Sequence, residues 1–559
     1  MASGCIGTVG DADVEARGSG AGGDSSAAGP GGPGDPSSGG PSQAACDDGE
    51  VHPGRAPLRR LTRFEYNNTV RDLLGDTTQP GFSLPSEDLG NGFGNDADTL
   101  SVSSLLAEQL GTVAEGIAQR ATATPEALAK LAPCAGDVDA ASELACARTI
   151  VERLAPRAYR RPLADGEADE LLALYTAGRE GATFAAGVAT VIEALLQTPD
   201  FLYRIEWGSP DPARPELLRP TGDEMATRLS YLFWGTMPDE ELRVAAQAGE
   251  LSTKEGVRAH AERMLDDPKA RPVLRFFFDN LLPISNLADL ERDAETFPTF
   301  SRSIGALLRE ETQRFLEHEI FEADGTWASI LTAPYSFMNG PLAQFYGIPG
   351  VTGDEFRKVE LDTTQRLGLL TQAGVMAGTT HSNMTNPVVR GSFVVQKLMC
   401  RTIPLPTGAI LEQVKPPEPY TGDTARQRYS QHSKDPVCAG CHKFMDPIGF
   451  AFENYDAVGL FRTTENDVEI DASGSVPGTE GTVSGPIELV QKLAETEEAQ
   501  SCFATRWTEY AYGLTLRSED ACTREAVTTA FKASGYNVKE LLIELTQTDA
   551  FHYMDPRQE

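Results

Sequence analysis

The pentapeptide CAGCH, residues 438–442, constrains the fold of this 559-residue chain more than any other stretch. Two thiols separated by two residues, followed directly by an imidazole, have the spacing by which a haem is attached. Each thiol bonds one vinyl group, and the histidine ligates the iron. The chain has only 9 cysteines and 7 histidines, so the pattern is rare by chance. We therefore expect one covalent haem c on Cys438 and Cys441, with His442 as the iron ligand.

Zinc and disulfide sites use the same residue types, and both stay open as alternatives. A structural zinc site requires a fourth ligand. His432 is the nearest candidate, but the sequence contains no second paired motif. A redox disulfide of the thioredoxin type follows an apolar strand, whereas residues 431–437 (QHSKDPV) are polar. Haem is the favoured interpretation.

Several residues are candidates for the second axial position of the iron. His381 and Met384 lie in a separate loop, THSNM, and we favour them as the sixth ligand, with an open site as the alternative. Met445 is a weaker candidate, because on a helix it shares one side with the motif histidine, three residues earlier. His432 is also weaker, because it is too close to the motif in sequence and is expected to hydrogen-bond instead.

Arg390 and Arg462 are candidates for contacts with the haem propionates, because a guanidinium group pairs well with carboxylates. Glu453 and Asp456 offer both arginines a partner within the protein. The sequence leaves the two possibilities open.

Hydrophobic periodicity predicts a mainly α-helical protein with several domains. The segment 61–75 ends at Gly75, a residue suited to a helix C-cap. The segment 221–235 opens with Thr221 and Glu224 in the spacing of a capping box. Further helices are expected at residues 101–121, 164–178, 184–196, 253–266, 303–323, 386–399, 485–496, 503–513 and 522–546. A Gly-rich, alternating segment predicts one small β hairpin near residues 469–485.

The charge and hydropathy of the chain argue against nucleic-acid binding and against a membrane-spanning helix. A net charge of −34 argues against a nucleic-acid partner, whose phosphates would repel the protein. No uninterrupted apolar run reaches the roughly 18 residues of a transmembrane helix. Contact with a membrane is therefore expected only through a lipid anchor.

The N-terminal residues MASGC place Cys5 after small residues, as in a bacterial lipoprotein signal, and Cys5 is a candidate for lipidation. The charged and apolar regions of such a signal are missing, as they would be if the start codon were assigned too far downstream. Residues 18–45 are rich in Gly, Ser and Pro and predict a flexible tether. We expect an exported lipoprotein, periplasmic or anchored in the outer membrane; an ordinary Cys5 in a ragged N-terminus is the alternative.

Six cysteines remain, an even number, as expected for disulfides in an oxidising compartment. Proximity in sequence predicts the pairs Cys134–Cys146 and Cys502–Cys522. Elimination then predicts the pair Cys46–Cys400.

The segment GNGFGNDAD, residues 90–98, is rich in residues with side-chain oxygens. Together with Asp88, just before it, its residues Asn95, Asp96 and Asp98 could supply oxygen ligands for calcium. The closing Glu of an EF-hand is absent, and Asx turns explain such clusters more often. Calcium is therefore possible but disfavoured.

The stretch CAGCHKFMDPIGFAFENYDAVGLFR resembles the cytochrome c-like module of the planctomycete-type multidomain cytochrome proteins, which also occur in myxobacteria. Other modules of that family are similar to LRRLTRFEYNNTVRDLLG, PRAYRRPLADGEADELLALY, RLSYLFWGTMPDEEL and YSFMNGPLAQFYGI. The resemblance covers roughly residues 58–556 and implies export, covalent haem and a helical architecture. It implies no particular reaction.

The expected organisation follows these modules: residues 1–50, the lipoprotein-like N-terminus and tether; 51–150, 151–215 and 216–355, three helical modules; 356–468, the cytochrome c-like haem module; and 469–559, a C-terminal helical module. Electron transfer to or from a redox partner protein is the expected function. A haem-dependent oxidoreductase with an open iron site is the first alternative. A helical binding or scaffold lipoprotein, with structural haem and a docking surface for a polymer or protein, is the second.

Overall fold

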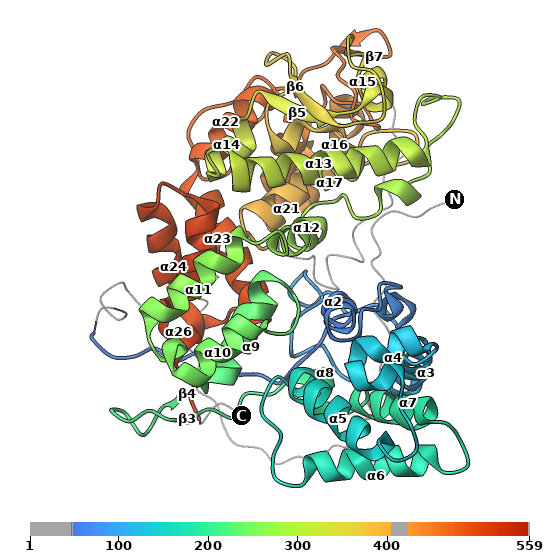
Figure 1. The fold of residues 1–559 in the computed structure, drawn as a ribbon. Helices are drawn as coiled ribbons and strands as arrows, with labels where there is room; N and C mark the ends of the chain where they lie inside the picture. Colours follow the sequence, from blue (N-terminus) through green and yellow to red (C-terminus); the bar gives the residue numbers. More distant parts are fainter. Residues whose placement is uncertain (1–45, 47, 404–422, 435, 557–559) are drawn as a thin grey trace, which may run out of the picture. The chain divides into compact units, whose positions relative to one another are not determined.

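The computed structural model describes residues 46, 48–403, 423–434 and 436–556. It confirms the prediction of a mainly α-helical, multidomain protein with small antiparallel hairpins (Figure 1). The predicted tether and Cys5 lie outside the described residues. Within the described part of the chain, no helix combines the length and the apolar character needed to cross a membrane.

The N-terminal helices pack around one hydrophobic cluster. They are α2 (Arg63–Leu74), α3 (Ser104–Ala121), α4 (Pro125–Leu131), α5 (Glu143–Tyr159), α6 (Glu167–Arg179), α7 (Phe184–Leu195) and α8 (Pro199–Leu202). Helix α2 begins with a capping box between Thr62 and Glu65 and ends at Gly75, whose φ of 76° is the left-handed conformation that glycine adopts readily. The predicted C-cap is therefore confirmed.

Most of the remaining helices share a second, larger cluster. They are α9 (Gly222–Phe233), α10 (Glu240–Ala248), α11 (Lys254–Asp266), α12 (Ala270–Leu281), α13 (Arg302–Glu322), α14 (Trp327–Thr332), α15 (Gly340–Tyr346), α16 (Ala373–Ala377), α17 (Pro387–Phe393), α21 (Pro436–Ala451), α22 (Pro486–Glu495), α23 (Glu497–Tyr512), α24 (Ala521–Ala533), α25 (Val538–Leu545) and α26 (Asp549–His552). Two short helices, α19 (Ala425–Arg428) and α20 (Gln431–Lys434), precede α21 and contribute none of their described side chains to this cluster. The rings of Phe277 on α12 and Trp507 on α23 stack at its centre, with centroids 3.6 Å apart. The capping box predicted at Thr221 and Glu224 begins α9.

Four two-stranded antiparallel sheets join these helices: β1 (Arg59–Arg60) with β2 (Tyr203–Arg204), β3 (Ser209–Pro210) with β4 (Leu218–Arg219), β5 (Tyr335–Met338) with β6 (Arg357–Glu360), and β7 (Thr464–Glu465) with β8 (Val468–Glu469). The hairpin predicted near residues 469–485 forms earlier, because Asn466 and Asp467 adopt positive φ angles and make a two-residue turn. In the predicted segment, the described residues form a single bridge between Gly474 and Val483.

Two predicted helices differ from the structure, one at its C-terminal end and one in its middle. The segment 386–399 begins as α17 and continues as a π-helical turn, η6 (Val394–Leu398). The segment 522–546 is two helices, α24 and α25, because the chain reverses at Gly535 and Tyr536, both with positive φ.

All six cysteines expected in disulfides form them, but two of the three predicted pairs are wrong. Cys134–Cys146 is confirmed, whereas the other bonds are Cys46–Cys522 and Cys400–Cys502. Cys502 lies ten residues before the end of α23, and Cys522 lies at the start of the following helix. At about 1.5 Å per residue, this separates them by about 15 Å along α23, too far for a disulfide.

Helices α17 and α21 cross at a contact between their backbones. A Cβ atom on Gly449 of α21 would overlap the carbonyl oxygen of Pro387, and one on Gly391 of α17 would overlap that of Met445. The two helices are therefore antiparallel and in a fixed register. This register places the first two turns of α21 away from the start of α17.

A buried polar network fastens the helix α13 to the segment that precedes α17. Glu311 on α13 accepts hydrogen bonds from the hydroxyls of Ser336 (2.6 Å) and Tyr346 (2.7 Å). The Tyr346 hydroxyl in turn accepts a hydrogen bond from the backbone N–H of Ala373 (2.9 Å). Burial raises the pKa of Glu311 to about 7, although these hydrogen bonds oppose the shift.

The substitution Gly449→Ala tests the backbone contact between α17 and α21. We expect it to lower the free energy of unfolding by about 1–3 kcal/mol, because the helices must separate to admit a methyl group. Gly440→Ala, on the same helix, is the matched control: among the residues that the structure describes, nothing lies within 4 Å of the added Cβ. Alanine is the better helix former, so this substitution should be neutral or stabilising. Urea unfolding followed by circular dichroism measures both, and equal effects would contradict the contact.

Glu311 predicts a specific dependence of stability on pH. Between its usual pKa of 4.5 and the folded value of about 7, the carboxyl ionises in the unfolded chain but stays protonated in the folded one. The stability that this group contributes is therefore lost as the pH rises through that window. Relative to the wild type, Glu311→Gln should gain up to about 3 kcal/mol between pH 4.5 and 7. A difference that stays constant with pH would refute this assignment.

Candidate functional site

The motif residues lie in the first two turns of α21. Pro436 is the first residue of this helix, a position where its missing N–H costs no hydrogen bond. Cys438 and Cys441 are three residues apart, so their side chains lie on one face, one turn from each other. Both cysteines and His442 are half-buried. The motif is thus presented at the surface of its helix.

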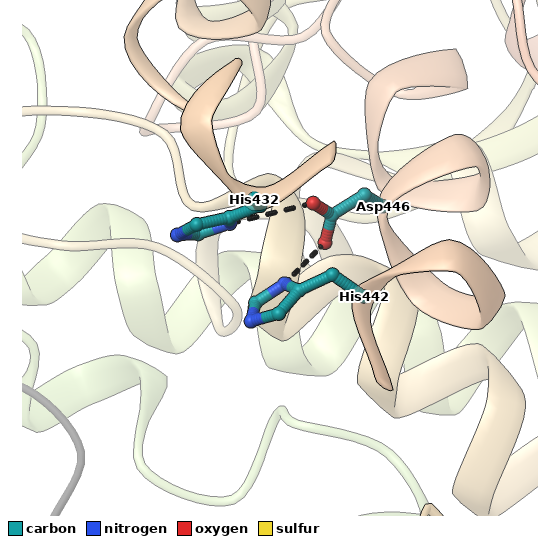
Figure 2. A group of neighbouring side chains, drawn as sticks. All are labelled: His432, His442 and Asp446. Atoms are coloured by element: carbon teal, nitrogen blue, oxygen red, sulfur yellow. Dashed lines mark hydrogen bonds and ion pairs between the residues drawn. The ribbon is translucent and has the colours of Figure 1, made fainter. Parts of the chain in front are cut away.

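His442, Asp446 and His432 form a compact group (Figure 2). Nδ1 of His442 is 2.9 Å from Oδ1 of Asp446, one helical turn further along α21. Nδ1 of His432, on α20, is 3.4 Å from Oδ2 of the same carboxylate, without the alignment of a hydrogen bond. The two imidazole rings pack with centroids 3.9 Å apart and planes inclined by 38°.

Asp446 is buried, with a relative exposure of 6%. This burial by itself raises the pKa of the carboxyl, but the nearby imidazoles of His432 and His442 outweigh it and hold the pKa below its usual value. An ionised Asp446 accepts a hydrogen bond from the N–H at Nδ1 of His442. The second nitrogen, Nε2, is then the atom with a lone pair for a metal.

The short helix α20 holds His432 in place over the motif. The backbone N–H of His432 donates to the carbonyl of Tyr429 (3.0 Å), and the two rings meet edge to face with centroids 5.3 Å apart. Because His432 packs against the face of the His442 ring, it lies beside that ligand. Its position therefore gives it no role as a second ligand opposite His442.

The loop that contains His381 and Met384 lies at the other end of α21. Thr385 donates to Glu453 (2.6 Å), just beyond the last residue of that helix. Nε2 of His381 is 3.0 Å from the side-chain nitrogen of Asn386. In this structure the loop therefore does not bring either candidate ligand to His442.

Met445 and the two arginines also have partners within the protein. Met445 is buried in the second hydrophobic cluster. Arg390 is fully buried and donates to the carboxylate of Glu453 (3.1 Å) and to three backbone carbonyls. Arg462 donates to the other oxygen of Glu453 (3.2 Å) and lies 3.4 Å from Glu465. Of the two possibilities that the sequence left open, the structure thus has the pairing of both arginines with Glu453.

The segment suggested for calcium uses its polar atoms to dock onto the C-terminal module. Asn95 donates to the carbonyl of Tyr510 (2.8 Å), and Asp96 accepts from Thr515 (2.8 Å). Asp98 pairs with Arg517 (2.7 Å), while Asp88 is exposed. Phe93, between them, stacks on Phe277 in the second cluster. Docking of one module onto another accounts for this composition.

The donor set at the start of α21 fits haem c. Two thiols on one helical face can bond two vinyl groups, and His442 has one nitrogen engaged by Asp446 and the other available for iron. The buried Nδ1 of His432, which has no aligned hydrogen-bond acceptor among the described residues, also suits a region built around a further group.

Asp446 is the site residue that sequence reasoning missed. The signal was present, because CHKFMD places a carboxylate four residues after the motif histidine, and such pairs meet on a helix. The contact with His432 had no comparable signal, since it depends on how α20 packs against α21.

Comparison with protein families accounts for most of the chain. Five family models match successive segments, each described as a protein of unknown function: DUF1587 over residues 59–123, DUF1595 over 146–206, DUF1592 over 221–348, DUF1588 over 366–465 and DUF1585 over 480–551. No curated protein and no solved structure matches the chain.

The DUF1588 match contains the CAGCH motif together with Asp446, His432 and Arg390. The five models together match most of the chain and all belong to one multidomain family. The chain belongs to the planctomycete-type multidomain cytochrome c-like proteins.

Proposed function

We propose that this chain is an exported c-type cytochrome that carries one covalent haem and exchanges single electrons with a partner protein. The observation that carries the proposal is the arrangement on α21. Cys438 and Cys441 share a face of the helix, and His442, held through Nδ1 by Asp446, keeps Nε2 for the iron.

The residues of the motif have separate tasks. Cys438 and Cys441 would hold the haem: each thiol would add across one vinyl double bond, with a carbon–sulfur bond formed and the thiol hydrogen placed on the other vinyl carbon, so that no oxidant would be needed. His442 binds the iron through Nε2, while Asp446 keeps the proton on Nδ1. Haem c, when bound, supplies a one-electron couple.

The setting of the motif suits exchange with another protein. The His442 side chain is 21% exposed, so a haem attached there would have an edge near the surface. The net charge of −34 favours a partner with a basic face and association that weakens with salt. Three disulfides support an oxidising compartment, and a lipid on Cys5 would hold the protein at a membrane surface.

A haem-dependent oxidoreductase is the alternative function. It is favoured by one observation: the loop of His381 and Met384 lies at the far end of α21, which would leave the iron open to a small molecule. Carbon monoxide distinguishes the two functions. A ferrous protein that binds it rapidly would support the enzyme, and one that is inert would support electron transfer.

The attachment site predicts the behaviour of a double variant. Cys438→Ala with Cys441→Ala should lose all covalent haem, because no thioether bonds can form. The haem stain on a denaturing gel and the mass of the intact chain measure this. Cys134→Ser with Cys146→Ser is the matched control and should keep its haem. Covalent haem in the first variant, or stoichiometric zinc without haem in the wild type, would overturn the proposal.

The placement of the 380–386 loop predicts that two further variants are silent. His381→Ala and Met384→Ala should each leave the visible spectra of the oxidised and reduced holoprotein unchanged, since their loop lies at the opposite end of α21 from His442. His442→Ala is the positive control, because it removes the ligand itself. A change of spin state in either loop variant would show that this loop does ligate the iron.

A further inference from the structure

We propose that Asp446 is a positioning residue for the iron ligand His442 and lowers the reduction potential of the haem, and that His432 moderates this effect. The inference rests on the proposed haem attachment and deepens it. It concerns the carboxylate shared by two imidazoles, which come from the two helices α20 and α21.

The hydrogen bond between His442 and Asp446 fixes the ligand in one tautomer and one orientation. Both residues lie on α21, four positions apart, so the helix itself sets their 2.9 Å approach. With the proton held on Nδ1, the ring presents its lone pair at Nε2 and is restricted in rotation. Partners of this kind orient a metal-bound histidine and raise its basicity.

The negative charge of Asp446 acts on the iron through this ring. A carboxylate that is only 6% exposed is poorly screened by water, so its field at the ligand is strong. A more basic ligand stabilises the oxidised iron, which carries the larger positive charge, over the reduced iron. The reduction potential therefore falls.

His432 is a second imidazole beside the same carboxylate. Its Nδ1 lies 3.4 Å from Oδ2, the oxygen that His442 does not use, and its ring covers the face of the His442 ring. An N–H at Nδ1 of His432 would attract negative charge toward Oδ2, so less of the charge of Asp446 would act on His442. Removal of the His432 imidazole should therefore lower the reduction potential further. Removal of the Asp446 carboxylate should raise the potential.

The test measures the midpoint potential of the full-length holoprotein at one pH, with optical spectra to count oxidised and reduced haem. Asp446→Asn keeps the size of the side chain and removes its charge. At the wild-type midpoint, we expect the ratio of reduced to oxidised haem to rise at least tenfold, which is about 59 mV for one electron. His432→Phe keeps the ring packing and should change the ratio in the opposite direction.

Two further variants separate positioning from general charge. Asp446→Glu restores the carboxylate and should move the potential back toward the wild-type value. Asp471→Asn removes one exposed carboxylate that lies just beyond the haem module in sequence and pairs with Arg426 of that module at 3.2 Å; it should change the ratio less than twofold.

Unchanged potentials in both Asp446→Asn and His432→Phe would overturn the inference. The hydrogen bond between His442 and Asp446 would then be a structural contact within the helix, without effect on the reduction potential. If Asp446→Asn takes up no haem, His432→Phe decides alone: a shift to lower potential supports the inference, and no shift overturns it. A wild-type chain without covalent haem would instead refute the proposed function, so the two failures are distinguishable.

Discussion

The contact between α17 and α21 is the constraint on which the placement of the site depends. Gly391 and Gly449 let the two backbones touch, and this contact sets a single register for the pair. Arg390 then joins α17 to the chain after α21 by donating to Glu453 and neighbouring carbonyls. A buried arginine is tolerated only when its charge is paired and its N–H groups are hydrogen-bonded. Loss of either Arg390 or Glu453 would therefore leave the other charge buried without its partner. The first two turns of α21 are thereby held away from this crossing.

Successive residues of α21 serve the core and the site in turn. Met445 faces the hydrophobic cluster, and its carbonyl touches Gly391, whereas Asp446 faces the two histidines. A shift of α21 against α17 would therefore move the ligand His442 as well. The stability of the helix pair and the geometry at the iron ligand are coupled through a single turn, which gives a rigid frame for a one-electron centre.

The sequence predicted the local features well, because they depend on neighbouring residues. The capping box of Thr221 and Glu224 and the C-cap at Gly75 appear as expected, since their hydrogen bonds close within one turn. The hairpin lies before the predicted Gly-rich stretch, because Asn466 and Asp467 adopt the positive φ angles of a two-residue turn. Disulfide pairing failed for a different reason: Cys502 pairs with Cys400 across two elements 102 residues apart, and proximity in sequence carries no information on such contacts.

The sequence by itself determined the chemistry of the site: two thiols, an imidazole and a carboxylate at helical spacing require no knowledge of the fold. Only the tertiary structure decided what surrounds that chemistry. It brought His432 onto the same carboxylate, gave Arg390 and Arg462 to Glu453, and carried His381 to the other end of α21. The physical reason is that a motif within two helical turns is positioned by its own backbone. The position of every other partner depends on how separate helices pack, and hence on close contacts such as those of Gly391 and Gly449.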